Sequence, residues 1–262
     1  MLFRRIKAHI EKENWFAVFI DFLIVVVGVF IGIQVSNWNE ARVTERDANS
    51  ARANLIADLH NDRDVYDVRK KFYLEVRNTA LRVENTLDSK LPQSLDAQWQ
   101  FIYDANNAGS MWPFKPSAQV YNQLLNSGKL SLLSTNSVRR QMRDYYQDAA
   151  LEAGLTFKFD SDYRYRSRGL IDGALNEYNI EACGNIIGAD PSNILETAQN
   201  YIPNCAAPEL SNHIQETAQR IYESEGLIND IRLQISQLGS LLAFLDYLDD
   251  EAEALIKELE KS

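Results

Sequence analysis

Hydrophobic and polar positions divide the chain into one continuous apolar run near its start and a long remainder in which apolar residues recur every three or four positions. Residues 15–35 contain one charged side chain, Asp21. As a helix this run would be about 31 Å long, close to the roughly 30 Å hydrocarbon core of a bilayer. Trp15 and Trp38 flank the run, as aromatic residues do at membrane interfaces. The pattern therefore predicts a transmembrane helix over residues 15–35.

Two other kinds of segment share this apolar character: the buried helix of a soluble protein and a cleaved signal peptide. The sequence IQVSNWNE at the end of the run offers no small-residue cleavage site, so we expect an uncleaved anchor. Residues 1–14 place Phe3, Ile6 and Ile10 on one side of a helix and basic residues elsewhere. This pattern predicts a short amphipathic tail on the inner membrane surface.

One face of the predicted span gathers small and polar residues. At about 100° per residue, Gly28 and Gly32 fall some 20° to either side of Asp21, and Asn39 returns to the direction of Asp21. We call this face the small-residue stripe; it consists of Asp21, Val25, Gly28, Gly32, Val35 and Asn39. Small residues let transmembrane helices approach closely, so the stripe predicts packing against a second copy. Two alternatives stay open for Asp21: it lines an ion path within an oligomer, or it reaches back to the lipid headgroups.

Beyond the span, apolar residues at helical spacing predict a long helical rod over residues 40–88. No glycine or proline occurs between Gly32 and Pro92. The apolar seam consists of Leu55, Leu59, Tyr66, Tyr73, Val76, Ala80, Val83 and Leu87. Because Asp62 and Arg69 interrupt it, we do not expect a regular coiled coil. The alternative is a pair of helices with a break near Asn61.

The segment after the rod contains two short predicted helices and a loop. We expect an amphipathic helix in LDAQWQFIYDA, followed by a loop in which Trp112 and Phe114 fill the core. Ser117 is the expected N-cap of the next helix, which ends at Gly128.

The remainder of the chain is also predicted to be helical. A helix capped by Asn136 or Ser137 is expected to continue to about Tyr178, and two more are expected near 209–238 and 240–260. The inward face of the last helix consists of Leu245, Leu248, Leu255 and Leu259. No strand-like alternation of any length occurs, so the predicted class is all-α: a transmembrane helix, a rod and an extracytoplasmic helical bundle over residues 36–262.

Charge and cysteine content bear on location. The formal net charge is −10, and an acidic chain repels phosphate backbones, so we expect no nucleic-acid partner. Cys183 and Cys205 are the only cysteines, and a lone pair in an exported domain typically forms a disulfide. They lie in a predicted inserted loop at about 181–210. We therefore expect a bacterial inner-membrane protein with its N-terminus in the cytoplasm and its C-terminal domain in the periplasm; two unrelated buried thiols are the alternative.

Candidate chemistry is sparse. The three histidines leave few bases for Ser-His or Cys-His catalysis, and SGKLS lacks the second glycine of a phosphate loop. Glu209, His213 and Glu216 share a helix face, but a di-metal bundle needs a second such set, so we expect no metal and no cofactor. The remaining candidate is a contact to an anionic ligand by Arg164, Arg166 and Arg168; a network of ion pairs inside the bundle is the alternative.

Three stretches carry a family resemblance. They are IVVVGVFIGIQVSNWNEAR, YNQLLNSGKLSLL and VRRQMRDYY, in that order. With them the chain resembles the bacterial membrane proteins catalogued as domain of unknown function 6090. The resemblance implies one N-terminal span with an acidic residue at the place of Asp21 and then a helical body. It implies no activity, and the cysteine-bearing insertion is not part of the pattern.

These observations favour a membrane-anchored periplasmic scaffold or interaction protein, without catalytic activity, that self-associates through its transmembrane helix. Its expected partners are the lipid bilayer, further copies of itself, and a periplasmic or membrane protein. Two alternatives stay open: a homo-oligomeric pore lined near Asp21, and an extracytoplasmic ligand-binding module that works with a separate partner.

Overall fold

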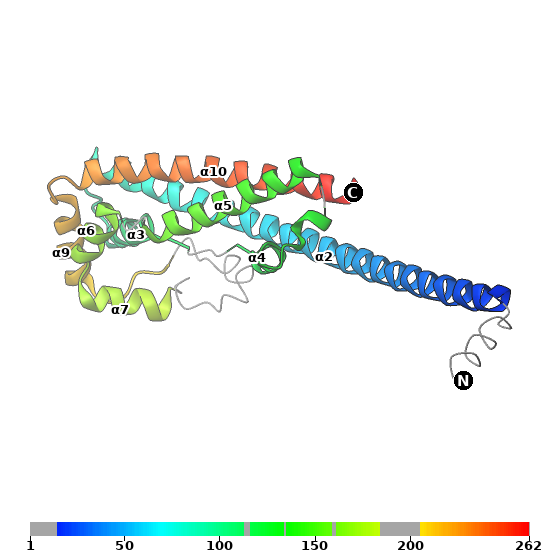
Figure 1. Cartoon of the computed structure of the whole chain (residues 1–262). Helices are drawn as coiled ribbons and strands as arrows, with labels where there is room; N and C mark the ends of the chain where they lie inside the picture. The colour runs from blue at the N-terminus through cyan, green and yellow to red at the C-terminus, as the bar shows by residue number, and fades with distance from the viewer. Residues whose placement is uncertain (1–14, 113–115, 134, 159–160, 184–204, 262) are drawn as a thin grey trace, which may run out of the picture. The chain divides into compact units, whose positions relative to one another are not determined.

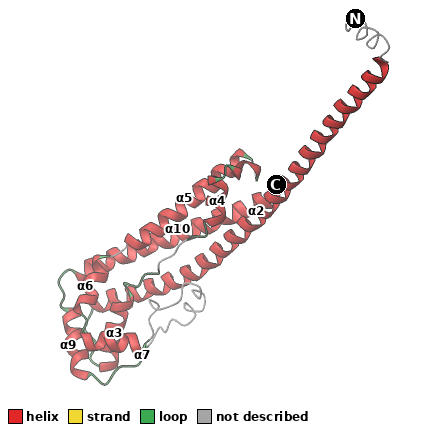
Figure 2. Ribbon diagram, turned by 60° about the horizontal axis from the view of Figure 1, so that its bottom comes forward, coloured by secondary structure: helices red, strands yellow, loops and turns green. Residues whose placement is uncertain are grey.

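The computed structural model of the chain describes residues 15–112, 116–133, 135–158, 161–183 and 205–261. It divides into two compact units, residues 1–52 and residues 53–262, which are described separately below. Within the described residues, all regular structure is helical and none is strand, which confirms the all-α prediction (Figure 2). The predicted amphipathic tail, residues 1–14, lies outside the described residues.

The first helix, α2 (Trp15–Leu87), begins in unit 1 and ends in unit 2. In unit 1 the apolar side chains of α2 that the structure describes are exposed: Phe22 is 65% exposed and Val35 is 57% exposed. By its length and composition, α2 is able to cross a membrane. None of the residues in its most apolar stretch is buried. A soluble protein's core helix would be mostly buried, so this exposure favours the predicted span over that alternative. The side chain of Trp15 lies outside the described residues.

In unit 2, α2 buries the predicted seam. From Leu55 to Val83 the seam residues are at most 1% exposed, whereas Leu87 is half-exposed. The two polar interruptions, Asp62 and Arg69, are fully buried on this face. The helix continues without interruption past Asn61, so the alternative of a break there is wrong.

The next helices largely follow the predicted pattern. Helix α3 (Leu95–Asn107) starts at the N-cap Ser94, whose side chain accepts a hydrogen bond from the backbone N–H of Ala97. Helix α4 (Gln119–Asn126) leads to the 3-10 helix η1 (Lys129–Leu132). Between α4 and η1, Gly128 has a φ of +69°, a conformation that glycine adopts without steric cost, as expected for a helix stop.

The prediction that Ser117 caps α4 is wrong. Residue Ala118 holds the N-cap position and makes no side-chain cap bond. Ser117 instead contacts α2: its N–H donates to Asp62 Oδ1 at 3.0 Å, and its Oγ accepts from Asn61 Nδ2 at 3.2 Å. The hydroxyl is therefore used to attach the preceding loop to α2.

One predicted long helix is in fact three: α5 (Asn136–Lys158), α6 (Asp162–Leu170) and α7 (Gly173–Ala182). Side-chain caps account for the new starts. Ser161 accepts from the N–H of Arg164, and Asp172 accepts from the N–H of Ala174. At the start of α5, Thr135 Oγ1 accepts from the N–H of Val138, so neither predicted cap residue fills that position.

The last two helices are α9 (Ser211–Tyr222) and α10 (Leu227–Lys261). The predicted break near residue 239 is wrong, because Gly239 lies inside α10. The chain breaks at Gly226, whose φ is +82°. The four predicted inward leucines of α10 are all fully buried, which confirms that face.

Ion pairs fix how α2 and α10 pack in unit 2. Arg63 Nε lies 2.7 Å from Asp249 Oδ1 near one end of the shared face, and Arg232 Nε lies 2.9 Å from Glu84 Oε1 near the other. Because the numbering rises along α2 while it falls along α10, the two helices are antiparallel (Figure 1). Helix α10 also packs against α5 and α6, and α3 packs against α6 and α9.

Candidate functional site

The small-residue stripe of α2 is exposed along its whole length. All six side chains from Asp21 to Asn39 are exposed in the single chain. A Cβ added to Gly28 or Gly32 would meet no atom within 4 Å. Neither glycine has a positive φ. Among the described residues, neither the backbone conformation nor a neighbouring atom therefore requires glycine at these two positions.

Beyond the apolar run, α2 presents an aromatic residue together with a basic one. The guanidinium carbon of Arg42 lies 5.0 Å from the ring centroid of Trp38, and Trp38 is 63% exposed. Residues four apart on a helix are neighbours, so this cation–π contact was visible in the sequence spacing, although Trp38 alone had been singled out. A ring and a cation at the end of an apolar helix suit the headgroup layer.

A cluster of buried polar side chains lies on the seam face of α2 in unit 2 and is centred on Asp62. The carboxylate of Asp62 is fully buried and accepts hydrogen bonds from the Ser117 N–H and from the Tyr145 hydroxyl, both at 3.0 Å. The Tyr145 and Tyr66 hydroxyls lie 3.1 Å apart. Burial raises the pKa of Asp62, and the two hydrogen bonds partly oppose this rise. The cluster joins α2, the loop before α4, and α5.

A second polar contact holds the loop after α3. The Tyr73 hydroxyl accepts from the N–H of Trp112 at 3.0 Å and lies 3.2 Å from its carbonyl oxygen. Arg69, fully buried, donates to the same carbonyl at 3.4 Å. The Trp112 ring is 6% exposed, so its predicted role in filling the core is confirmed; Phe114 lies outside the described residues.

The cavity beside the second polar contact is too small for a substrate. The cavity next to Tyr73 has a volume of about 20 Å³ and is also lined by Met111 and Gln234. That volume holds about one water molecule. These buried polar groups therefore act in holding helices and loops together.

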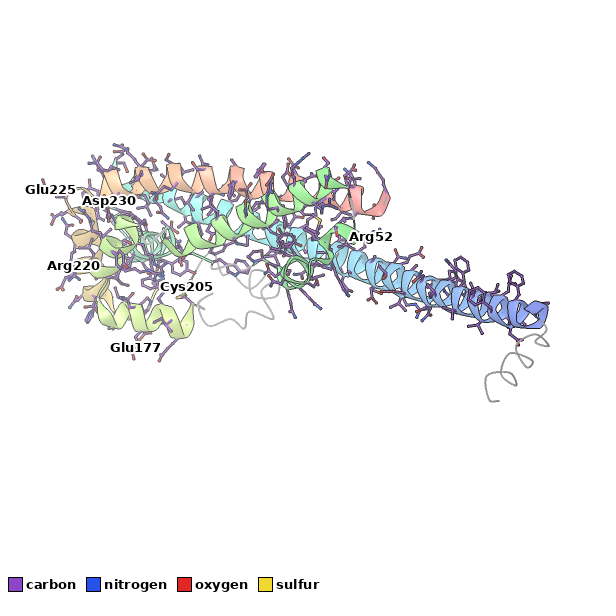
Figure 3. All side chains as sticks on the ribbon, viewed as in Figure 1. Arg52, Glu177, Cys205, Arg220, Glu225 and Asp230 are labelled. Carbon is purple, nitrogen blue, oxygen red and sulfur yellow. A yellow bond between two sulfur atoms is a disulfide. The ribbon has the colours of Figure 1, made fainter. Side chains whose placement is uncertain are left out.

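The three arginines proposed for anion binding lie on α6, and Arg164 and Arg166 have the following contacts with other parts of unit 2. Arg164 donates to the carbonyl oxygen of Gly109 at 2.5 Å. Arg166 donates to the carbonyl oxygen of Glu225 at 2.6 Å and lies 2.8 Å from Asp230, both labelled in Figure 3. These contacts favour the alternative of a network inside the bundle. A contact of all three, including Arg168, with an anionic ligand stays a prediction.

The cysteine pair has the geometry of a disulfide. The sulfur atoms of Cys183 and Cys205 lie 1.93 Å apart and the Cα atoms 5.4 Å apart, so the predicted pairing is confirmed in its geometry. Adjacent backbone is bonded to two helices: Trp99 Nε1 donates to the Cys205 carbonyl at 2.9 Å, and the Tyr178 hydroxyl donates to the Ala206 carbonyl at 3.1 Å. Residues 184–204 of the predicted inserted loop lie outside the described residues.

The residues weighed for metal binding do not gather in the described part of the chain, where no group of three His, Cys, Asp or Glu side chains has a suitable arrangement. His213 Nδ1 instead lies 3.0 Å from Asp172 Oδ1, between α9 and the N-cap of α7. The bond from the Ala174 N–H, together with His213, lowers the pKa of the half-buried Asp172 carboxyl. This pair was missed because the two residues are far apart in sequence.

One comparison with known proteins found a match. A family profile described as a family of unknown function (DUF6090) matches residues 21–152, which are 132 of the 262 residues. The matched residues contain the apolar part of α2, the polar cluster around Asp62, and most of α5. No curated protein and no solved structure matches the chain.

Proposed function

The chain belongs to the DUF6090 family of unknown function, and we propose that it is a membrane-anchored helical scaffold that self-associates through α2. The observation that carries the proposal is the exposed stripe around Gly28 and Gly32, which contacts no other element among the residues that the structure describes. Lipid gives no reason to gather glycines and an acid on one face, whereas a second helix does, because small residues allow close backbone approach.

We propose a single-pass topology in a bacterial inner membrane, with residues 1–14 in the cytoplasm and unit 2 in the periplasm. The disulfide geometry of Cys183 and Cys205 supports this orientation, because the periplasm is oxidising and the cytoplasm keeps thiols reduced. The Trp38–Arg42 pair supports an interfacial position for the end of the span.

The proposed role of unit 2 is to present a rigid helical surface above the membrane, without catalysis. Its buried polar side chains support this role, since Asp62 and Tyr73 are used in bonds to Ser117 and Trp112. Asp21 belongs to the proposed interface in the membrane. A carboxyl there loses less hydration when it faces another helix than when it faces lipid tails.

The mass of the detergent-purified particle tests the proposal. We expect the wild type to be an oligomer and the double variant Gly28→Leu/Gly32→Leu to be largely monomeric, because leucine side chains separate the backbones. The matched control is Val26→Leu/Phe30→Leu, which alters two exposed positions with the same spacing on the opposite face. We expect this control to assemble like the wild type.

Three outcomes would count against the proposal. A wild-type particle with the mass of one chain would remove self-association. Equal masses for the stripe variant and the control would remove the stripe as the interface. Ionic current through planar bilayers that is present for wild type and lost in Asp21→Asn would favour a pore.

A further inference from the structure

Charged residues are segregated along the sequence of unit 2. Between Asp104 and Asp144 the chain contains no acidic residue, and its charged side chains are Lys115, Lys129, Arg139, Arg140 and Arg143. The whole chain has a formal net charge of −10. A basic segment of this length gives an acidic protein one positively charged surface.

The structure places the basic side chains on η1 and the first turns of α5. Lys129, Arg140 and Arg143 are exposed, and Leu125 on the adjoining α4 is 51% exposed. Arg143 and Asp144 form an ion pair at 3.2 Å, but both side chains are more than half exposed, so water screens the pair. We call these four residues, Leu125, Lys129, Arg140 and Arg143, the basic surface.

The last turns of α10 carry the opposite charge. From Asp246 to Glu260 the sequence contains seven acidic residues and one lysine. Asp249 faces Arg63 and Lys70 on α2. Asp246 is 66% exposed and Asp250, one turn further on, is also exposed. We call Asp246 and Asp250 the acidic surface.

Both surfaces lie beside the same few turns of α2 in unit 2. On the basic side, Ser117 and Tyr145 bond to Asp62. On the acidic side, Asp246 lies 3.3 Å from Lys70. Residues 62 and 70 are separated by about 12 Å along a helix. Helix α5, which carries Arg140 and Arg143, packs against η1 and against α10, which carries the acidic surface, so both surfaces belong to one bundle.

We propose that the basic surface of one copy docks on the acidic surface of a neighbouring copy in the same membrane. The inference rests on the proposed self-association through α2. Opposite charges on neighbouring copies attract, whereas like surfaces repel. The contact is head-to-tail, so every copy uses one surface of each sign, and such contacts form a closed ring when the rotation between copies closes.

The strength expected of this contact follows from its exposure. Exposed ion pairs are individually weak, and salt screens charges beyond about 8 Å at physiological ionic strength. The docking surfaces therefore orient copies that the small-residue stripe already holds together. The exposed Leu125 adds apolar area at the edge of the basic surface.

Charge reversal and charge exchange in the full-length chain in detergent test this inference. The variants are Arg140→Glu/Arg143→Glu, Asp246→Arg/Asp250→Arg, and the combination of all four changes. The readout is the concentration at which the assembled particle dissociates, measured by light scattering at about 0.05 M and about 0.5 M salt. The control Lys71→Glu/Arg220→Glu makes the same change of charge as the reversal of the basic surface, at two exposed positions outside both surfaces.

We expect either pair of reversals to make dissociation about fivefold easier at low salt, and we expect high salt to remove the difference. The combined variant restores assembly because it exchanges the two signs, and the control behaves like wild type. Unchanged assembly in both reversals, with dissociation still caused by Gly28→Leu/Gly32→Leu, overturns this inference and leaves the proposed function standing. A reversal of the basic surface that the combination fails to rescue also overturns it, because the partner is then not a second copy.

Discussion

At the scale of single residues, Asp62 shows how one buried acid shapes the stability of unit 2. Its carboxylate is fully buried and has two donors, Ser117 and Tyr145. Burial raises the pKa of Asp62 above its usual value of 3.8, so the folded chain binds this proton more tightly than the unfolded chain. The free energy of unfolding therefore falls as the pH rises from about 4 through the raised pKa. Asp58, one turn away, has a pKa raised by burial and acts in the same direction.

We predict that Asp62→Asn reduces this pH dependence. The amide oxygen still accepts from Ser117, and its NH₂ group donates to the Tyr145 oxygen, so the fold is kept. The stability of Asp62→Asn relative to wild type is expected to increase between about pH 4 and pH 7. Asp62→Ala removes the same titration but leaves both donors without an acceptor, so we expect it to be less stable than Asp62→Asn by about 1–3 kcal/mol at every pH. Chemical unfolding at several pH values, followed by circular dichroism, checks both; parallel pH curves for Asp62→Asn and wild type would contradict the first.

Not every acid in unit 2 acts in this direction. Burial alone would raise the pKa of Asp249, but hydrogen bonds from Arg63 and Lys70 outweigh it and lower that pKa. The contribution of Asp249 is present above pH 3.8 and is lost as the pH falls through its lowered pKa. Above about pH 4 the fall in wild-type stability therefore comes from acids with raised pKa values, and the comparison with Asp62→Asn isolates the part that belongs to Asp62.

At the scale of elements, Gly226 and Gly239 show where sequence reasoning failed. Both glycines lie within helical patterns, and the predicted break was placed at the second. The structure breaks the chain at Gly226, where φ is +82° and an added Cβ would lie 2.8 Å from Arg166 Nη1. Gly239 lies inside α10 with open space around it. Arg166 comes from α6, about 60 residues away, so no local pattern could separate the two glycines.

We predict that alanine has opposite effects at these two positions. Gly226→Ala forces a left-handed conformation on a residue with a side chain and displaces Arg166, which costs about 1–2 kcal/mol or more. Gly239→Ala removes an intrinsic helix penalty without a clash and is expected to gain about 0.5–1 kcal/mol. Thermal unfolding of the two single variants checks the prediction. Destabilisation by Gly239→Ala would show that this position is covered in the assembled protein.

The elements predicted correctly are those in which buried apolar residues repeat at helical spacing. The seam of α2 from Leu55 to Val83 could be predicted because one buried face repeats at helical spacing over many turns. The starts of α6 and α7 could not, since each depends on one cap, Ser161 or Asp172, within a stretch whose pattern is also compatible with a single long helix. The contacts around Asp62 and Arg166 join residues far apart in sequence, so they needed the fold.

At the scale of the whole molecule, location and stability are linked by the disulfide. Cys183 ends α7 and Cys205 precedes α9, and the bond closes a loop whose ends are 22 residues apart. In the chain-entropy account, a loop of this size stabilises the folded state by about 3 kcal/mol. Trp99 and Tyr178 donate hydrogen bonds to the backbone at and beside Cys205, which holds this cysteine in position for the disulfide. An oxidising compartment maintains such a bond.

We predict that the full-length chain, extracted from cells under denaturing conditions directly into a maleimide, has no thiol that reacts with the maleimide until the chain is reduced. The same chain without residues 1–35 is expected to stay in the cytoplasm, to show two reactive thiols, and to unfold at a lower temperature. Cys183→Ser/Cys205→Ser in the full-length chain separates the two effects, because it keeps the location and removes only the bond; we expect it to lose about 3 kcal/mol of stability. Reactive thiols in the full-length protein before reduction would reverse the proposed orientation, since they would place unit 2 on the reducing side of the membrane.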